Sequence, residues 1–254
     1  RFEEIERFDR IVNRRVNNNI MLVAPSGSGK TALVYGWMRH LAAREEFSSF
    51  ELLQLDVEHL HALDDEPHLE ERFLEAFAHL PKCILFIDDF GRETARNTAL
   101  LQRLFRVYKK MLKEPHVHVI LTLEPQEYEW VARECPAFAH LFETIQLKEQ
   151  SVHEYARILQ STLPQLNATH HIIVPDSALA EVVALTARFP ILGHMPKAAI
   201  RVLDESLSLS ASKHRKFLRQ DAIAQVIEAK TGVPKSRLTE DELSHIKDLE
   251  AQLN

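Results

Sequence analysis

The chain has 254 residues, of which 45% are hydrophobic and 27% charged, so it can bury a core in one large domain or two modest ones. Its formal net charge of −6 argues against a surface built to bind nucleic acid. No apolar run approaches the roughly 18 residues of a membrane-spanning helix, which argues against a membrane protein.

The two cysteines, Cys83 and Cys135, are isolated in the sequence. Unpaired cysteines are typical of a reducing compartment, and no signal peptide opens the chain, so we expect a cytoplasmic protein. The sequence begins at Arg1 without Met and ends at Asn254 within a polar pattern. We therefore expect a piece of a longer protein.

Apolar side chains recur at helical spacing over residues 2–16, which predicts a helix that three asparagines at 17–19 bring to an end. The apolar run 20–23 then predicts a buried strand, and a Gly- and Ser-rich turn leads from it into a second helical pattern. This turn matches the phosphate-binding pattern G-x-x-x-x-G-K-[ST] except that Ala24 replaces the first glycine. A strand before and a helix after are the context that this motif requires.

Glycines in such a loop let backbone N–H groups approach phosphate oxygens, and the helix N-terminus adds partial positive charge. Lys30 can reach the β- and γ-phosphates of a nucleotide, and the hydroxyl of Thr31 can ligate Mg²⁺. The sequence thus predicts a site for the phosphates of a nucleotide and for Mg²⁺. The nucleotide-binding residues predicted in this loop are Pro25, Ser26, Gly27, Ser28, Gly29, Lys30, Thr31 and Ala32.

Further apolar runs predict strands, and amphipathic runs predict helices between them. This alternation predicts an α/β fold, with a parallel sheet covered by helices on both faces and ligands at the carboxyl ends of its strands. The strands are expected at 50–57, 83–87, 117–123 and 142–147, and the helices at 69–80 and 95–113.

Three polar residues near strand ends are the candidate catalytic residues. Asp88 is expected to hold Mg²⁺ through water, and the residue after it normally polarises the attacking water. That residue is Asp89, one methylene shorter than Glu, and misplacing such a group by about 1 Å can cost ~10²-fold in rate. Thr122 lies near the end of its strand, where it could hydrogen-bond the γ-phosphate or the water, although a purely structural threonine fits equally well.

Beyond residue 150 the strand pattern stops and a bundle of helices is expected. We therefore divide the chain into an α/β subdomain at 1–149, a helical lid at 150–230 and a polar linker at 231–254. Pairs of histidines do not reach the ligand number of a metal site, so core or surface roles are favoured for them. The expected helices span 151–166, 175–189, 195–212 and 219–231.

Taken together, these motifs resemble the first nucleotide-binding domain of the Clp family of double-ring AAA+ unfoldases. The resemblance implies a hexameric ring, protein substrates or adaptors as partners, and a second ring domain beyond this chain. It also implies that ATP sits between the α/β part and the lid, with Ile158 and Pro196 near the base. The matching segments are 2–36, 69–73, 84–89, 151–159, 170–179, 195–206 and 231–242.

The departures from the family pattern fall on the parts that support rapid turnover. Asp89 replaces the usual glutamate, and His140 and Leu141 stand where the family has a pair of arginines that reach the neighbouring subunit's nucleotide. Where an arginine finger is used, its loss costs roughly 10³–10⁵ in rate. The acidic segment 64–67 stands where the family has an aromatic pore loop. We therefore expect weak or no hydrolysis and a role in ring assembly.

Two alternatives remain open from the sequence. The domain could be an active ATPase motor that unfolds or remodels proteins, with Asp89 as base and an arginine from elsewhere, such as Arg133, as finger. It could also be a nucleotide-independent scaffold domain or a DNA-linked ATPase, although the acidic balance weighs against DNA.

Overall fold

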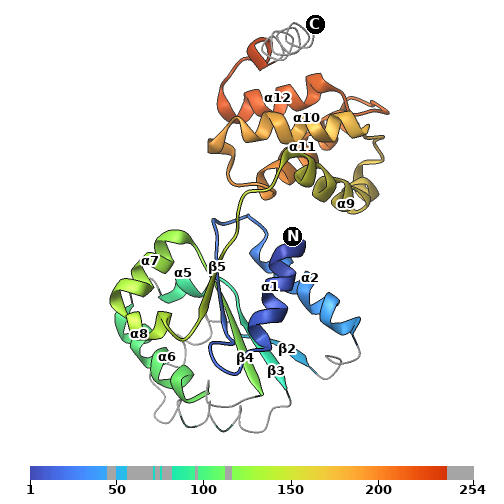
Figure 1. Cartoon of the computed structure of the whole chain (residues 1–254). Coiled ribbons are helices and arrows are strands. Elements are labelled where there is room, and N and C mark those ends of the chain that lie inside the picture. The colour runs from blue at the N-terminus through green and yellow to red at the C-terminus, as the bar shows by residue number, and fades with distance from the viewer. Residues whose placement is uncertain are drawn as a thin grey trace, which may run out of the picture. The chain divides into compact units, whose positions relative to one another are not determined.

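The computed structural model describes residues 1–44, 50–55, 71, 75, 82–94, 97–111 and 116–238 (Figure 1). The chain divides into two compact units, Arg1–Lys148 and Glu149–Asn254. The predicted strand end at 56–57, the predicted helix at 69–80, the acidic segment 64–67 and the end of the linker lie outside the described residues.

The first unit is built on a five-stranded parallel sheet in the order β2-β3-β4-β1-β5. The loop that follows β1 therefore emerges next to the carboxyl end of β4, and β3 lies one strand further out. The predicted α/β fold is confirmed. The strands are β1 (Ile20–Val23), β2 (Glu51–Gln54), β3 (Cys83–Ile87), β4 (Val117–Leu123) and β5 (Glu143–Gln146).

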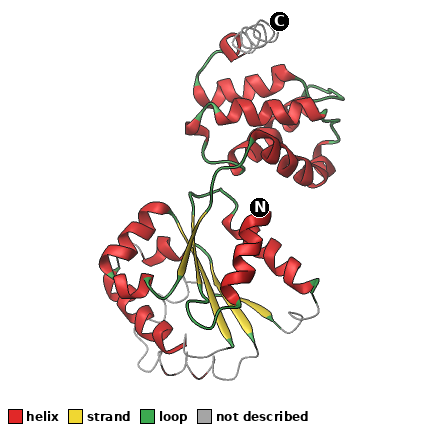
Figure 2. Ribbon diagram, in the orientation of Figure 1, coloured by secondary structure: helices red, strands yellow, loops and turns green. Residues whose placement is uncertain are grey.

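Helices cover both faces of this sheet (Figure 2). Successive side chains of β1 point to opposite faces of the sheet. Ile20 and Leu22 pack in one core with α1 and α2, whereas Met21 and Val23 pack in the other core with α6 and α8. The helices of this unit are α1 (Phe2–Val12), α2 (Lys30–Ala42), α5 (Phe90–Thr94), α6 (Thr98–Met111), α7 (Pro125–Glu134) and α8 (Pro136–Ala139).

The first helix is shorter than its apolar pattern predicts. It ends at Val12, where Asn13 forms the C-cap and its side-chain amide donates to the carbonyl of Asp9 at 2.8 Å. Val16, counted in the predicted helix, is 75% exposed in the turn that leads to β1. Upstream of that turn the helix is firmly held, because Phe8 packs edge-on against Trp37 with ring centroids 5.3 Å apart.

The second unit is a bundle of helices with its own apolar core (Figure 1). It is the helical lid expected from the sequence, although α9 runs four residues beyond its predicted end and closes at His171, whose φ is +55°. None of the helices in the described residues is long and apolar enough to cross a membrane. The elements are α9 (Val152–His170), α10 (Asp176–Ala187), the 3₁₀ turn η2 (Pro190–Leu192), α11 (Lys197–Ser212) and α12 (Gln220–Thr231).

A buried histidine in β4 makes the stability of the first unit depend on pH. His118 is 6% exposed beside the ring of Phe50, and its Nδ1 has no hydrogen-bond partner. Burial lowers the pKa of His118 and the charge of Lys82 lowers it slightly further, against a hydrogen bond to the backbone of Asn18 that raises it. The folded protein therefore resists a proton that the unfolded chain accepts near pH 6.5.

We expect the urea midpoint of unfolding to fall as the pH drops below about 6.5, and a His118→Phe variant to lose part of this fall. The reason is that phenylalanine fills the same space without titrating. The exposed His153→Phe variant is the matched control and should keep the wild-type pH dependence. If the urea midpoint depended on pH equally in wild type and in His118→Phe, His118 would not be the source of the pH dependence.

Candidate functional site

The loop after β1 wraps around the start of α2. The N–H of Ala24 donates to the carbonyl of Leu123 at 3.1 Å, which extends the β1–β4 ladder by one residue before the chain turns away. Gly27 and Gly29 then adopt φ values of +82° and +91°, in the left-handed region that glycine occupies without a steric penalty. An added Cβ at Gly29 would meet nothing within 4 Å, so this glycine is required for backbone conformation rather than for space.

The first turn of α2 offers unoccupied donors to a ligand. Gly29 is its N-cap, and no side chain caps the helix. The N–H groups of this 13-residue helix therefore face the loop together with its partial positive charge. The hydroxyl of Ser28 is buried without a hydrogen-bond partner, which marks a polar position in the loop that a bound phosphate could satisfy.

Lys30 brings a full positive charge into the loop. Its side chain is only 6% exposed, and its Nζ donates to the carbonyl oxygens of Ala24 at 2.8 Å and Pro25 at 3.3 Å. No carboxylate forms an ion pair with it among the residues described in the loop or the strand ends around it. A buried ammonium whose hydrogen bonds go only to carbonyl oxygens keeps its full positive charge, which favours the binding of an anionic ligand.

The carboxylate of Asp88 joins three elements at the edge of the sheet. Its Oδ2 accepts a hydrogen bond from Thr31 Oγ1 and its Oδ1 accepts one from Thr122 Oγ1, both at 2.6 Å. The structure thus brings the predicted residues of α2, β3 and β4 into direct contact. Hydroxyl and carboxylate oxygens are the ligands that Mg²⁺ prefers, so Thr31 and Asp88 fit the predicted metal site.

Asp89 continues this hydrogen-bonded chain through its backbone. Its N–H donates to Thr122 Oγ1 at 2.8 Å, and its φ of +50° is one that aspartate tolerates better than most residues. Its side chain is exposed, whereas the next residue, Phe90, is fully buried and stacks on Phe138 with ring centroids 5.6 Å apart. Asp89 therefore presents an exposed carboxylate on a firmly anchored backbone.

A further carboxylate near the site was not predicted from the sequence. Glu127 Oε2 accepts the N–H of Glu124 at 2.7 Å in a capping box at the start of α7. Burial raises the pKa of Glu127, and the charge of Asp89 raises it further while that of Lys30 lowers it, so the three groups lie within electrostatic reach. The signal that could have revealed it is the Glu-Pro-x-Glu pattern directly after β4.

Other predicted residues fall outside this cluster. Ile158 packs against the core of the helical unit and Pro196 is buried there, so their contact with a nucleotide remains a prediction. His140 is exposed, and Arg133 pairs with its own neighbour Glu134 at 3.2 Å on α7. Within the described residues, no group of three or more His, Cys, Asp or Glu side chains could hold a metal ion.

Comparison with known families assigns the class. Residues 20–144 match the ATPase family associated with various cellular activities (AAA), and residues 151–253 match the AAA lid domain. The first match contains the whole cluster described above, from the loop after β1 to Thr122 at the end of β4. The chain is therefore a AAA domain followed by a AAA lid.

Individual relatives place the chain within this class. It is 28% identical over 261 residues to the chaperone protein ClpB of Aquifex aeolicus and 26% identical over 317 residues to the ATP-binding subunit ClpE of Bacillus subtilis. Both matches cover 100% of this chain, but only 26% and 45% of those proteins. The chain thus spans about a quarter to a half of the length of these relatives.

Solved structures agree. The Saccharomyces cerevisiae Hsp104–ADP complex matches with a TM-score of 0.82 at 25% identity, covering 100% of this chain and 45% of that one. The closed state of Hsp104 with ATPγS and FITC casein matches with a TM-score of 0.79, at the same identity and covering 46% of that chain. The chain is homologous to the first nucleotide-binding domain of ClpB, ClpE and Hsp104, and the Clp resemblance is confirmed.

The position of Glu127 leaves no room for a side chain at Gly91. An added Cβ at Gly91 would lie 2.3 Å from Oε2 and 2.5 Å from Cβ of Glu127. Gly91→Ala should therefore lower the free energy of unfolding by about 1–3 kcal/mol in urea denaturation. Gly36→Ala is the matched control, because a Cβ on this glycine of α2 meets nothing within 4 Å and should stabilise the helix by up to about 1 kcal/mol. A Gly91→Ala protein as stable as wild type would show that Glu127 lies elsewhere.

Proposed function

We propose that this chain is the ATP-binding AAA+ module of a Clp-like ring protein, in which bound nucleotide supports ring assembly while hydrolysis is weak or absent. The observation that carries the proposal is the contact of Asp88 with both Thr31 and Thr122 beside the loop that holds Lys30. ATP would supply the phosphoanhydride bond that is hydrolysed, and Mg²⁺ would shield the negative charge of the phosphates. The Hsp104 structures with ADP and ATPγS support nucleotide binding by this homologous domain.

The chain's own groups have separate tasks in this proposal. The uncapped N–H groups of α2 and the ammonium of Lys30 bind the phosphates. Thr31 would ligate Mg²⁺ and Asp88 would hold it through water, and Thr122 positions the Asp88 carboxylate through their 2.6 Å hydrogen bond. By similarity to the Clp and Hsp104 relatives, we also propose that the protein forms a ring and has a second ring domain. We propose further that it acts on protein substrates or adaptors and is located in the cytoplasm.

Slow turnover is proposed because the groups that accelerate hydrolysis are altered. Asp89 reaches one methylene less far than glutamate, and its backbone is held between Thr122 and the buried Phe90, which limits how far the residue can shift toward a substrate. His140 and Leu141 offer no guanidinium to a neighbouring subunit.

An active motor is the second candidate, and one observation favours it. Glu127 adds a carboxylate within electrostatic reach of Asp89 and Lys30. A group there could take over part of the water-polarising task that the shorter Asp89 performs poorly.

Nucleotide binding should depend on Lys30. Replacing Lys30 with Ala removes charge-assisted hydrogen bonds of about 1.5–3 kcal/mol, so affinity for ATP with Mg²⁺ should fall roughly 10- to 100-fold in calorimetric titration. Nucleotide-dependent self-association, followed by sedimentation velocity, should be lost as well. The exposed Lys110→Ala on α6 is the matched control and should behave like wild type. Failure of the wild type to bind ATP at millimolar concentration would favour a nucleotide-independent scaffold.

The rate of ATP hydrolysis distinguishes a slowly hydrolysing ring module from an active motor. In single-turnover assays of assembled protein, Asp89→Glu should raise a slow wild-type rate by about 10²-fold, and adding His140→Arg with Leu141→Arg should raise it further. Asp89→Asn is the control that removes the carboxylate at constant size. A fast wild-type rate that falls in Glu127→Gln would reject slow turnover and establish the motor.

A further inference from the structure

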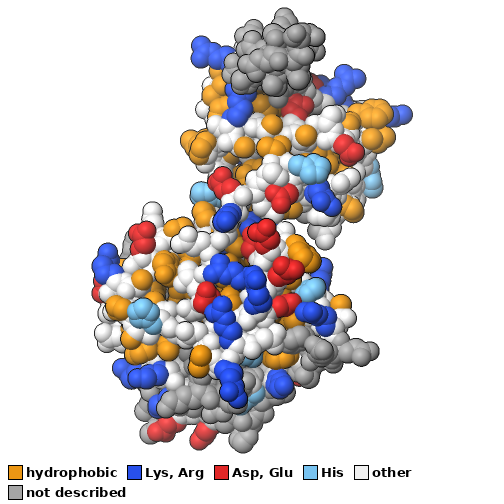
Figure 3. Space-filling view, in the orientation of Figure 1, with side chains coloured by type: hydrophobic (Ala, Val, Ile, Leu, Met, Phe, Trp, Pro, Cys, Tyr) orange, Lys and Arg blue, Asp and Glu red, His pale blue; other side chains and the backbone are white. Residues whose placement is uncertain are grey.

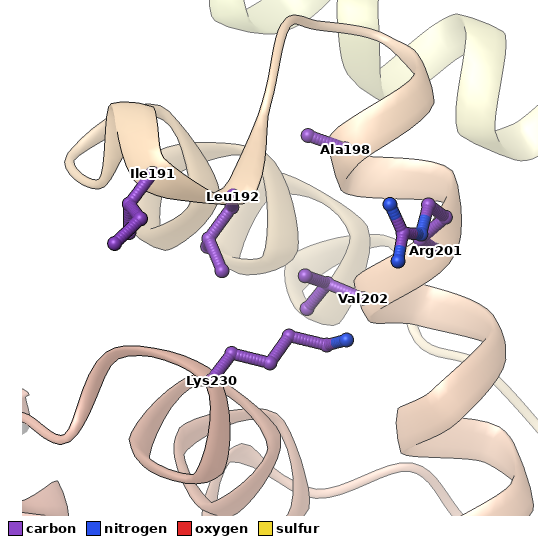
Figure 4. A pocket seen from close by; sticks show the side chains of 6 residues that line it. All are labelled: Ile191, Leu192, Ala198, Arg201, Val202 and Lys230. Atoms are coloured by element: carbon purple, nitrogen blue, oxygen red, sulfur yellow. The ribbon is translucent and has the colours of Figure 1, made fainter.

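A pocket of about 220 Å³ lies entirely within the helical unit, between η2, α11 and α12 (Figure 4). It is remote in sequence from every residue of the phosphate-binding loop. Its volume is below the roughly 300–1,000 Å³ of sites for drug-sized ligands, and suits one or two side chains of a partner. The residues that line it are Ile191, Leu192, Ala198, Arg201, Val202 and Lys230.

Most of the side chains that line this pocket are aliphatic. Val202 and Ala198 on α11 form a buried base, and Leu192 on η2 is half-buried beside them. Ile191 at the rim is 79% exposed, the largest exposure among the large hydrophobic side chains described. Figure 4 shows Ile191 and Leu192 on one side of the pocket and Arg201 on the other. An aliphatic side chain entering there would cover apolar surface that now faces water.

The other side carries one uncompensated positive charge. Lys230 Nζ pairs with Glu205 Oε1 at 2.6 Å, so its charge is already balanced. Arg201 forms no ion pair with any residue in the described part of the chain, and its guanidinium points toward the pocket (Figure 4). A guanidinium presents a planar fork of donors that binds a carboxylate in bidentate fashion.

We propose that this pocket binds a protein segment in which an acidic residue adjoins an aliphatic one. The aliphatic side chain rests on Ile191, Leu192 and Val202, and the carboxylate pairs with Arg201. Nucleic acid fits the site poorly, because single-stranded nucleic acid is bound by several cations together with stacking aromatic rings, and the described residues that line this pocket include one cation without an ion pair and no ring. Lys and Arg are also interspersed with Asp and Glu on the visible face of the molecule (Figure 3).

This inference does not depend on nucleotide binding, because no residue of the pocket takes part in the proposed ATP site. The test uses the full chain and a short fluorescein-labelled peptide with adjacent Leu and Glu flanked by Gly and Ser. Fluorescence anisotropy should show saturable binding, and replacing either the Leu with Ser or the Glu with Gln in the peptide should weaken it at least about 10-fold, the value of one charge-assisted contact.

Variants of the protein test whether the peptide binds in this pocket. Arg201→Glu should weaken peptide binding about 10-fold or more, and Ile191→Ser should weaken it without changing the preference for Glu over Gln. Both side chains are exposed, so neither change should unfold the unit. Arg157→Glu, a matched exposed arginine on α9, should bind like wild type. Absence of binding at millimolar peptide, unchanged binding by Arg201→Glu, or displacement of the peptide by an oligothymidine would overturn the proposal.

Discussion

The carboxylate of Asp88 is the contact on which the geometry of the candidate site depends. Three elements that are far apart in the sequence meet at this group, because Thr31 begins a helix, Asp88 follows β3 and Thr122 lies in β4. The parallel strand order brings their ends to one edge of the sheet, and the two 2.6 Å hydrogen bonds set the spacing within that edge. The same two hydrogen bonds satisfy both oxygens of this half-buried carboxylate.

The sheet supplies the rigidity that this arrangement requires. Every residue of β1, β3 and β4 is buried, and the two faces of the sheet pack in separate apolar cores. A close-packed interior of this kind resists small displacements of the strand ends. Hydrophobic packing thus fixes the strand ends, and the hydrogen bonds of Asp88 then fix the polar side chains relative to one another.

Much of this could be predicted from the sequence, because the controlling signals are local. Apolar runs separated by helical patterns determine a parallel sheet, and two glycines before a lysine at a strand-to-helix junction determine the loop. The end of α1 at Val12 was missed, since the apolar pattern continues to Val16 while the chain must already turn toward β1. Glu127 was missed for a different reason. Its carboxylate is fixed by a cap at the start of α7 and packs against the bare backbone of Gly91 in α5, and this second contact joins two helices that are separate in the sequence.

The aromatic side chains behind the site have a mechanical consequence. Phe90, next to Asp89, stacks on Phe138, and Phe138 in turn contacts Phe142 with ring centroids 5.1 Å apart. His140 and Leu141 lie between those last two rings in the sequence. Because close-packed rings compress little, a shift of the backbone at Asp89 would press on Phe138 and, through it, on the segment that carries this dipeptide. The backbone beside Asp89 and the segment that carries His140 and Leu141 are thus joined through one continuous cluster of aromatic rings.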